Sequence, residues 1–386
     1  MPGEFEIPHS HRRVGLVIYL PNFFGGENKF SCDLAACLID AGFEVAISSL
    51  AKPREGKCYE EFLRVQNWFT PKVTFNLGKL YRMIFNQRQN LNKMIKEFKP
   101  EFIIGSATEP AVMLGLKAKK IMYTHFPTEL RMSSHSLLAE VYRSVYWWQH
   151  NKALSELNAI VCNSEFTKTI TWMAWRRSQP DKAKYSVIYP SVDTEKLKDA
   201  MRLQRDPYKI CYVGRLDKDK GIDYVLDAFQ KIKKEIPGAK LEIVGAVSKS
   251  KTAQAYFSDL TAKAEKIGDV IFKTNVPESG IVETLSTAQC MASFNPDEHF
   301  GIVPIEAMAL GCPPIVADGG GQRETVIHGE TGFLAKEPSE IEVYIHKLLT
   351  DNKLASYVSE KAMVHAEKFS RKSFVEKWIE LFNIVR

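Results

Sequence analysis

Short apolar runs alternate with amphipathic segments along most of the chain. In the first half these runs have the length and β-branched content of buried strands, and they span residues 14–20, 43–48, 102–105, 120–124 and 159–162. The segments between them include 27–40 and 79–98, where apolar residues recur at helical spacing. Strands that alternate with helices favour a parallel sheet with helices on both faces.

The alternation restarts in the second half, with predicted strands at 209–213, 241–245, 270–272, 290–293 and 315–317. Residues 191–207 lack periodicity and include Pro207, so we place the link between two domains there. The length of 386 residues also exceeds the usual size of a single core. We therefore expect an α/β protein with two doubly wound Rossmann-like domains, residues 1–190 and 191–370, across a cleft. A last amphipathic helix, about 371–386, should pack back on the first domain.

Composition and charge narrow the class of protein. With 45% hydrophobic and 25% charged residues the sequence is typical of a globular protein, and no apolar run reaches the ~18 residues of a membrane span. The N-terminus lacks the basic and apolar parts of a signal peptide, and the seven cysteines form no C-x-x-C pair. We therefore expect a cytoplasmic protein with reduced, buried cysteines and no structural zinc. The net charge of +6 comes from the first half, which predicts either a solvated basic surface or one that meets an anionic membrane or acceptor.

An aromatic stripe at helical spacing runs through residues 136–157 and includes Tyr142, Tyr146, Trp147 and Trp148. Such a stripe belongs either to the core or to a surface that touches lipid head groups, because amphipathic rings and long cationic side chains suit that interface. Both interpretations stay open from the sequence alone.

Two glutamates eight positions apart mark the segment 297–311. Glu298 lies in a polar turn, whereas Glu306 lies in an apolar run that should be helical. Phe300 and Gly301 allow a tight turn between them, so the unpaired N–H groups of the first helical turn would face the same pocket as Glu298. A helix N-terminus can hold a phosphate, and carboxylates accept hydrogen bonds from hydroxyls. The segment therefore suits a nucleotide sugar.

Further polar groups follow predicted strands, where open α/β sheets place ligands. Arg215 and Lys220 flank a turn after strand 209–213 and can hold phosphate oxygens. His125 follows strand 120–124 and is either structural or functional there.

Two glycine loops are harder to interpret. Gly25 and Gly26 either make a simple turn or bring backbone amides close to a phosphate, and they match neither the Walker pattern nor G-x-G-x-x-G. The glycines at 319–321 either make a turn or bring Glu324 to a ligand.

Several motifs in combination resemble a known family. They are Tyr212–Leu216 with Lys220 and Gly221, Glu298–Gly301 with Glu306–Gly311, Gly319 and Gly320 with Glu324, and Thr331–Leu334. At this spacing they closely resemble the retaining GT-B glycosyltransferases of family 4, and the resemblance covers nearly the whole chain. It implies a GT-B fold and transfer of a hexose from a nucleotide sugar with retention of configuration.

The resemblance implies roles for residues at matching positions. Arg215 and Lys220 would hold the donor diphosphate and stabilise the leaving group. Glu306 would take the ribose hydroxyls and Glu298 the donor hexose, with His125 at the reacting sugar. Further donor-binding positions are implied at Gly25, Gly26, Asn275, Val276, Phe300, Gly301, Ile302 and Val303.

The residues of two motifs, 298–304 and 123–127, imply the donor and the acceptor. They look most like the corresponding motifs of mannosyltransferases that use GDP-mannose and extend lipid-linked oligosaccharides or phosphoinositol lipids. We find no Asp-x-Asp signature for a metal, so we expect no metal and no cofactor. The acceptor would be lipid-linked or a phospholipid, at the cytosolic face of an anionic membrane, and we expect no nucleic acid partner. Many relatives have an arginine near Asn28 that this chain lacks, which leaves the acceptor-side contacts open.

Three alternatives come from other donors or other classes. One is a family 4 transferase that uses UDP-glucose or UDP-N-acetylglucosamine on a soluble or polysaccharide acceptor. The second is a catalytically silent nucleotide-sugar-binding protein. A phosphorylase or epimerase with this fold is disfavoured, because we find no context for a pyridoxal-bearing lysine and because an epimerase would not need Glu298 and Glu306 so arranged.

Overall fold

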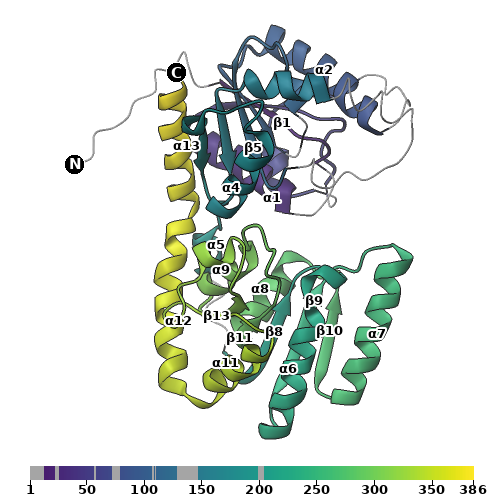
Figure 1. Ribbon diagram of the computed structural model, residues 1–386, viewed down its shortest axis with the longest axis vertical. Coiled ribbons are helices and arrows are strands. Elements are labelled where there is room, and N and C mark those ends of the chain that lie inside the picture. The colour runs from purple at the N-terminus through teal and green to yellow at the C-terminus, as the bar shows by residue number, and fades with distance from the viewer. Residues whose placement is uncertain are drawn as a thin grey trace, which may run out of the picture. The chain divides into compact units, whose positions relative to one another are not determined.

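The computed structural model describes residues 13–21, 26–55, 58–71, 79–106, 108, 110–127, 147–198 and 204–386. The chain divides into two compact units, which we describe separately. Unit 1 comprises Met1–Ser191 with Arg371–Arg386, and unit 2 comprises Val192–Ser370. Each unit is built on its own parallel sheet (Figure 1), which confirms the predicted fold class.

The sheet of unit 1 has seven strands among its described residues, in the order β3-β2-β1-β4-β5-β6-β7. The strands are β1 (Arg13–Val17), β2 (Glu44–Ser48), β3 (Asn67–Phe69), β4 (Phe102–Ser106), β5 (Lys119–Thr124), β6 (Ala159–Cys162) and β7 (Tyr185–Val187). The helices are α1 (Gly26–Asp40), α2 (Lys79–Glu97), α4 (Glu165–Trp175) and α13 (Arg371–Val385), with a helical segment at 147–155. Short 3-10 turns are η2 (Glu60–Arg64), η3 (Pro110–Met113) and η5 (Lys182–Lys184). The strand order changes direction between β1 and β4, which is the topological switch point of a doubly wound fold.

Side chains of the central strands alternate between two cores in unit 1. Leu16 and Ile104 lie in a core that includes α1 and α13. Their neighbours Val17 and Ile103 lie in the opposite core, which includes residues of α2. Strands β4 and β6 are buried along their whole length, as expected for strands covered on both faces.

Helix α13 completes the core of unit 1. Phe374, Trp378 and Phe382 are buried in the core shared with α1. The Phe382 ring stacks on Phe102 of β4, with the ring centroids 4.4 Å apart. The last helix of the structure is therefore part of the first unit, although unit 2 precedes it in the chain.

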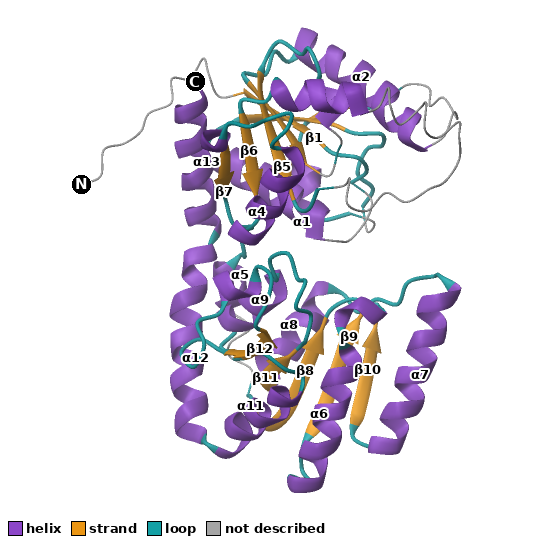
Figure 2. Cartoon of the chain, viewed as in Figure 1, coloured by secondary structure: helices purple, strands orange, loops and turns teal. Residues whose placement is uncertain are grey.

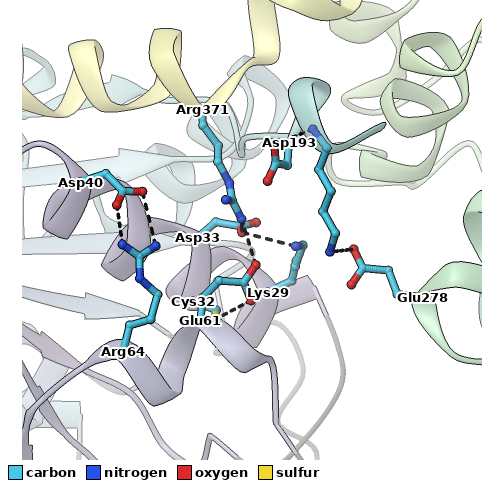
Figure 3. Close-up of polar contacts among 10 residues, drawn as sticks. Lys29, Cys32, Asp33, Asp40, Glu61, Arg64, Asp193, Glu278 and Arg371 are labelled. Carbon is cyan, nitrogen blue, oxygen red and sulfur yellow. Dashed lines mark hydrogen bonds and ion pairs between the residues drawn. The ribbon is translucent and has the colours of Figure 1, made fainter. Parts of the chain in front are cut away.

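Arg371, the first residue of α13, enters a charged cluster with α1 and η2 (Figure 3). Its guanidinium lies 2.8 Å from Asp33 and 3.1 Å from Glu61, and Lys29 lies 3.3 Å from Asp33. Burial raises the pKa of the Asp33 carboxyl, although Lys29 and Arg371 oppose this. Two cations around two carboxylates reduce the cost of burying the charges, so the cluster holds the start of α13 against α1.

Among the residues of unit 2 that the structure describes, the sheet has six strands, in the order β10-β9-β8-β11-β12-β13 (Figure 2). They are β8 (Asp206–Val213), β9 (Lys240–Gly245), β10 (Val270–Thr274), β11 (Ala288–Ala292), β12 (Pro314–Ala317) and β13 (Phe333–Ala335). The helices are α5 (Thr194–Lys198), α6 (Ile222–Glu235), α7 (Lys251–Ile267), α8 (Glu278–Thr287), α9 (Ile302–Ala309), α10 (Gln322–Thr325), α11 (Ser339–Thr350) and α12 (Asn352–Ala366). The 3-10 turns are η7 (Lys218–Lys220) and η8 (Glu367–Phe369).

Strand β9 shows how the faces of this sheet differ. Leu241 points into the core that contains residues of α6 and α11. Glu242 points to the opposite face, where Lys209 and Lys273 each lie 2.9 Å from its carboxylate and Thr284 of α8 donates a hydrogen bond to it. A buried carboxylate with these partners ties three strands to α8.

Some segments differ from the sequence-based expectation. The link expected at 191–207 contains α5, and β8 already begins at Asp206. Strand β13 was not predicted, because its three residues are too short for any periodicity. The region 51–99, which gave no clear pattern before the helix, holds η2, the edge strand β3 and α2.

Candidate active site

Three polar loops leave the same edge of the unit 2 sheet. They follow β8, β11 and β12, which are neighbours in that order. The carboxyl ends of parallel strands meet at one edge, so the loops 214–221, 293–301 and 318–321 lie together. Five of the predicted site residues lie on them: Arg215, Lys220, Glu298, Phe300 and Gly301.

Glu298 binds two donors through one carboxylate oxygen. Its Oε2 lies 2.9 Å from Nζ of Lys220 and 3.1 Å from Nδ2 of Asn295. Burial raises the pKa of the Glu298 carboxyl, but Lys220, His299 and the Asn295 amide outweigh this and hold the pKa below its ordinary value. Glu298 is therefore an anion at neutral pH, and Lys220 from the loop after β8 is its counter-ion.

The glycine loop after β12 holds the backbone of Glu298. The N–H of Gly321 donates to the carbonyl of Glu298 at 2.8 Å. Gly320 has a φ of +54°, and a Cβ there would lie 2.1 Å from the same carbonyl oxygen, so only glycine fits. This gives the loop 319–321 a structural role beside Glu298.

Arg215 is exposed and contacts carboxylates of its own loop. Its guanidinium is in close contact with Asp217 and lies 3.7 Å from Asp219. Asp217 and Asp219 form an Asp-x-Asp pair, so the statement that the sequence holds no such pair was wrong, but both carboxylates contact the arginine. In the part of the chain that the structure describes, no group of three or more His, Cys, Asp or Glu side chains is arranged to hold a metal ion.

Helix α9 begins directly after the Glu298 turn. Gly301 has a φ of +85°, which turns the chain into the helix. The N–H groups of Ile302 and Val303 lie in the first turn, where no helical carbonyl precedes them, and their side chains are half-buried. Glu306 lies one turn further along α9 and is also half-buried. The predicted arrangement of a turn, a helix N-terminus and two glutamates is present.

Asn275 and Val276 follow β10 and precede α8. Asn275 has a φ of +54°, and its N–H donates to the carbonyl of Gly245 at 3.1 Å. Gly245 in turn lies against Gly214, since a Cβ on Gly245 would be 1.8 Å from the Gly214 carbonyl. Backbone contacts therefore connect the expected nucleobase segment to the loop that carries Arg215.

His125 lies at the end of β5 in unit 1, as the sequence predicted. Its Nε2 is 3.5 Å from the hydroxyl of Ser106, and its ring packs edge-on against Phe30 and Tyr123. The Ser106 hydroxyl is 3.0 Å from that of Ser31 on α1. The described contacts of the histidine are therefore two aromatic rings and the hydroxyl of Ser106.

Gly26 is the first residue of α1, and no described atom lies within 4 Å of a Cβ built on it. The described packing therefore gives no steric reason for a glycine there. Gly25 lies outside the described residues, and so does the part of the aromatic stripe at residues 136–146.

The described end of the aromatic stripe divides between core and surface. His150 is buried and packs against Trp147 and Trp175, with ring centroids 5.4 Å and 5.9 Å away. Trp148 is 61% exposed and has Lys152 over its ring. Among the described helices, none combines the length and the apolar content needed to cross a membrane.

Three residues that support the site were not predicted. Asn295 precedes Glu298 by three positions, and Asn followed by Pro is a turn signal that could have indicated it. Ser106 comes close to His125 through the pairing of β4 with β5, and Ser31 reaches Ser106 through the packing of α1. No local pattern could have found them.

Comparison with known proteins identifies the family. The protein-family model described as Glycosyltransferase Family 4 matches residues 24–196 of the sequence. The family model described as Glycosyl transferases group 1 matches residues 193–364. Two similar proteins are alpha-1,3/1,6-mannosyltransferases named ALG2. The human one is 26% identical over 295 residues, which cover 70% of this chain and 70% of that protein. The Dictyostelium discoideum one is 24% identical over 419 residues, which cover 95% of this chain and 97% of that protein.

Solved structures share the fold. The crystal structure of Anabaena Alr3699/HepE in complex with UDP and glucose matches with a TM-score of 0.73, covering 97% of this chain and 100% of that one at 18% identity. At this identity the likeness shows the fold alone. The predicted family is confirmed by the two models: the chain is a glycosyltransferase with the GT-B fold, in which a Glycosyltransferase Family 4 domain precedes a Glycosyl transferases group 1 domain.

Proposed function

We propose that this glycosyltransferase moves α-mannose from GDP-mannose onto a lipid-linked or phospholipid acceptor, with retention and without a metal. The observation that carries the proposal is the pairing of Lys220 with an ionised Glu298 directly before the N-terminus of α9. That grouping offers a cation, a carboxylate and helix N–H groups to one ligand, which suits the diphosphate and hydroxyls of a nucleotide sugar. The likeness to ALG2 mannosyltransferases supports mannose as the sugar.

The nucleotide-sugar donor and glycan acceptor of a glycosyltransferase define the chemistry. The bond between the anomeric carbon and the diphosphate oxygen breaks, and its electrons leave on the diphosphate. The acceptor oxygen bonds to the anomeric carbon on the same face, and its proton passes to the departing phosphate oxygen. In our proposal Arg215 and Lys220 stabilise the leaving diphosphate, because preorganised cations act where charge develops.

The other residues bind and orient. Glu298 accepts hydroxyls of the hexose, and Glu306 accepts those of the ribose. The N–H groups from Phe300 to Val303 face the donor at the start of α9. His125, with Gly25 and Gly26, acts from unit 1 on the reacting sugar and on the acceptor.

The nucleobase is assigned to the segment of Asn275 and Val276. Both residues lie at the end of β10, the edge strand of the sheet order, and Asn275 is exposed. Backbone groups there give the base hydrogen-bond partners without a charged side chain.

The donor is tested by incubating the protein with GDP-mannose, UDP-glucose and UDP-N-acetylglucosamine, each with and without EDTA. We expect hydrolysis and thermal stabilisation with GDP-mannose, unchanged by EDTA. Response to a UDP-sugar alone would replace the mannose proposal by the UDP-sugar alternative. Binding without turnover, also in the presence of a lipid extract as acceptor, would favour the catalytically silent alternative.

We also place the acceptor at the cytosolic face of a membrane, and α4 offers a surface for it. Met173 is 61% exposed, and Arg176 and Lys182 lie 5.4 Å and 4.3 Å from the Trp172 ring. Arg176, Arg177 and Lys182 are all exposed. An indole with exposed cations beside an exposed methionine suits an anionic lipid surface.

Vesicle flotation tests this contact. The protein should bind vesicles of phosphatidylcholine with phosphatidylserine more tightly than phosphatidylcholine alone. Reversing the charge of Arg176 and Arg177 to Glu should weaken binding by about 10-fold or more, since each cation near such a surface contributes about 1 kcal/mol. The matched control is Lys361→Glu in unit 2, where the cation also lies over an exposed ring, that of Tyr357. Equal binding by all variants would refute the α4 surface.

A further inference from the structure

Asn295 builds the turn that carries Glu298. Its carbonyl accepts the N–H of Glu298 at 3.2 Å, and its side-chain Oδ1 accepts the N–H of Asp297 at 3.2 Å. Asparagine at the first position and proline at the second, here Pro296, are favoured in a type I turn. The sequence Asn-Pro-Asp-Glu therefore folds this turn by itself.

The turn also fixes which way the Asn295 amide faces. The backbone N–H of Asp297 can only donate, so the amide atom beside it must be the oxygen. The amide nitrogen is then directed to Glu298, where it donates to Oε2 at 3.1 Å. The orientation of this donor follows from the backbone and needs no other side chain.

The two oxygens of Glu298 have different surroundings. Oε2 receives both Lys220 and Asn295, which uses its two lone-pair directions. Across the residues that the structure describes, no donor reaches Oε1, and the side chain is 26% exposed. One oxygen is held by the protein and the other is open to a ligand.

We propose that Asn295 is a positioning residue that keeps Oε1 of Glu298 directed at the donor sugar when Lys220 engages the diphosphate. The inference rests on the proposed function, because it takes Glu298 as the group that binds the sugar. Lys220 holds Glu298 here but has a second task at the phosphate, and a lysine is a point charge on a flexible stem. The Asn295 amide is fixed by its own turn, so its bond to the carboxylate does not depend on the lysine.

The decisive variant is Asn295→Asp. Aspartate accepts the Asp297 N–H as asparagine does, so the turn is kept, but a like charge replaces the donor beside Glu298. We expect kcat to fall about 10- to 100-fold, as for loss of a hydrogen bond to a charged group. The acid limb of kcat/KM should move to higher pH, because the pKa of Glu298 rises. Lys220, His299 and Tyr212 are the other titratable groups that face Glu298, and they are unchanged.

Two further variants separate positioning from folding. Asn295→Ser keeps an acceptor for the turn and loses the donor without adding a charge, so its fall in kcat and its pH shift should be smaller than those of Asn295→Asp. Asp297→Asn alters an exposed neighbour in the same turn and should leave both quantities unchanged.

Binding measurements separate this inference from the choice of donor. Asn295→Asp should weaken binding of the intact nucleotide sugar, yet leave binding of the nucleoside diphosphate alone unchanged. The assays use whichever nucleotide sugar the wild-type protein binds best, so failure of GDP-mannose refutes the donor and not the role of Asn295. Two outcomes would overturn the positioning role. One is that Asn295→Asp keeps the wild-type kcat and the wild-type acid limb of kcat/KM. The other is that it weakens binding of the nucleoside diphosphate and of the nucleotide sugar equally.

Discussion

The two units hold their candidate residues in different ways. In unit 2, Glu298 is held by Lys220, Asn295 and the backbone of Gly321, and Arg215 is paired with acids of its own loop. In unit 1, His125 lies among serine hydroxyls and aromatic rings. The contacts of Glu298 involve a charged lysine, whereas the contacts described for His125 are a hydroxyl and aromatic rings.

The difference matches what each half is proposed to bind. A diphosphate and its sugar need fixed cations and carboxylates, and these are preorganised where side chains brace one another. The acceptor brings a neutral hydroxyl, for which a charged surrounding would add a desolvation cost. We infer that charge changes in unit 2 should have larger effects than polar changes in unit 1.

The largest effect is expected for Lys220→Ala. Loss of one charge-stabilising contact typically costs about 10²–10³ in rate. The matched control is Lys218→Ala, an exposed lysine in the same turn, which should retain wild-type turnover. Steady-state transfer rates measure both, with thermal unfolding to confirm that each variant is folded. Turnover within a few-fold of wild type in Lys220→Ala would contradict the role, and Arg215→Ala should behave like Lys220→Ala.

The next effect separates the two glutamates. Glu298→Ala should chiefly lower kcat, by about 10²-fold, because it contacts the transferred sugar. Glu306→Ala should chiefly weaken binding of the nucleotide, by about 10-fold, because it loses ribose hydrogen bonds. Titration calorimetry with the nucleoside diphosphate and transfer kinetics distinguish them, and the opposite pattern would mean that the roles are interchanged.

A smaller effect is expected in unit 1. Ser106→Ala removes the hydroxyl beside His125 and should lower kcat by about 5-fold, in line with a neutral hydrogen bond of about 1 kcal/mol. Ser106→Thr keeps the hydroxyl and should recover part of the activity. A drop as large as that of Lys220→Ala would break the contrast between the units.

The smallest effect concerns pH. The pKa of Glu298 is lowered in the folded protein, so its contribution to stability is present above the unfolded pKa and is lost as pH falls through the folded pKa. Lys220→Ala should reduce this contribution, so the melting temperature of the variant and that of wild type should differ most near neutral pH and converge in acid. Melting curves between about pH 3 and 7 test this. A constant difference at every pH would show that Glu298 is not the group involved.

Most of the fold followed from the periodicity of apolar residues. Strands such as β4 and β6 are wholly buried, so their sequences are continuous apolar runs that are easy to recognise. β13 and α5 were missed because each is too short for its period to be visible. The segment 191–207, in which we expected the link, holds α5 and the first residues of β8.

Only part of the candidate site could be predicted from the sequence. Glu298 and Lys220 belong to motifs with fixed spacing, and the structure brings them to 2.9 Å. The contact of Ser106 with His125 depends on the parallel pairing of β4 with β5, and that of Ser31 depends on how α1 packs. Such contacts follow from tertiary structure alone.

The place of α13 in unit 1 has a consequence for biosynthesis. Phe374, Trp378 and Phe382 fill the core of unit 1, and Arg371 neutralises its buried Asp33, yet all four follow unit 2 in the chain. A growing chain on the ribosome therefore has every strand of unit 1 long before it has the helix that closes its core. Domains usually fold in the order of synthesis, but here unit 2 can finish first. Until α13 emerges, unit 1 exposes apolar surface, and chaperones that hold nascent chains should bind there.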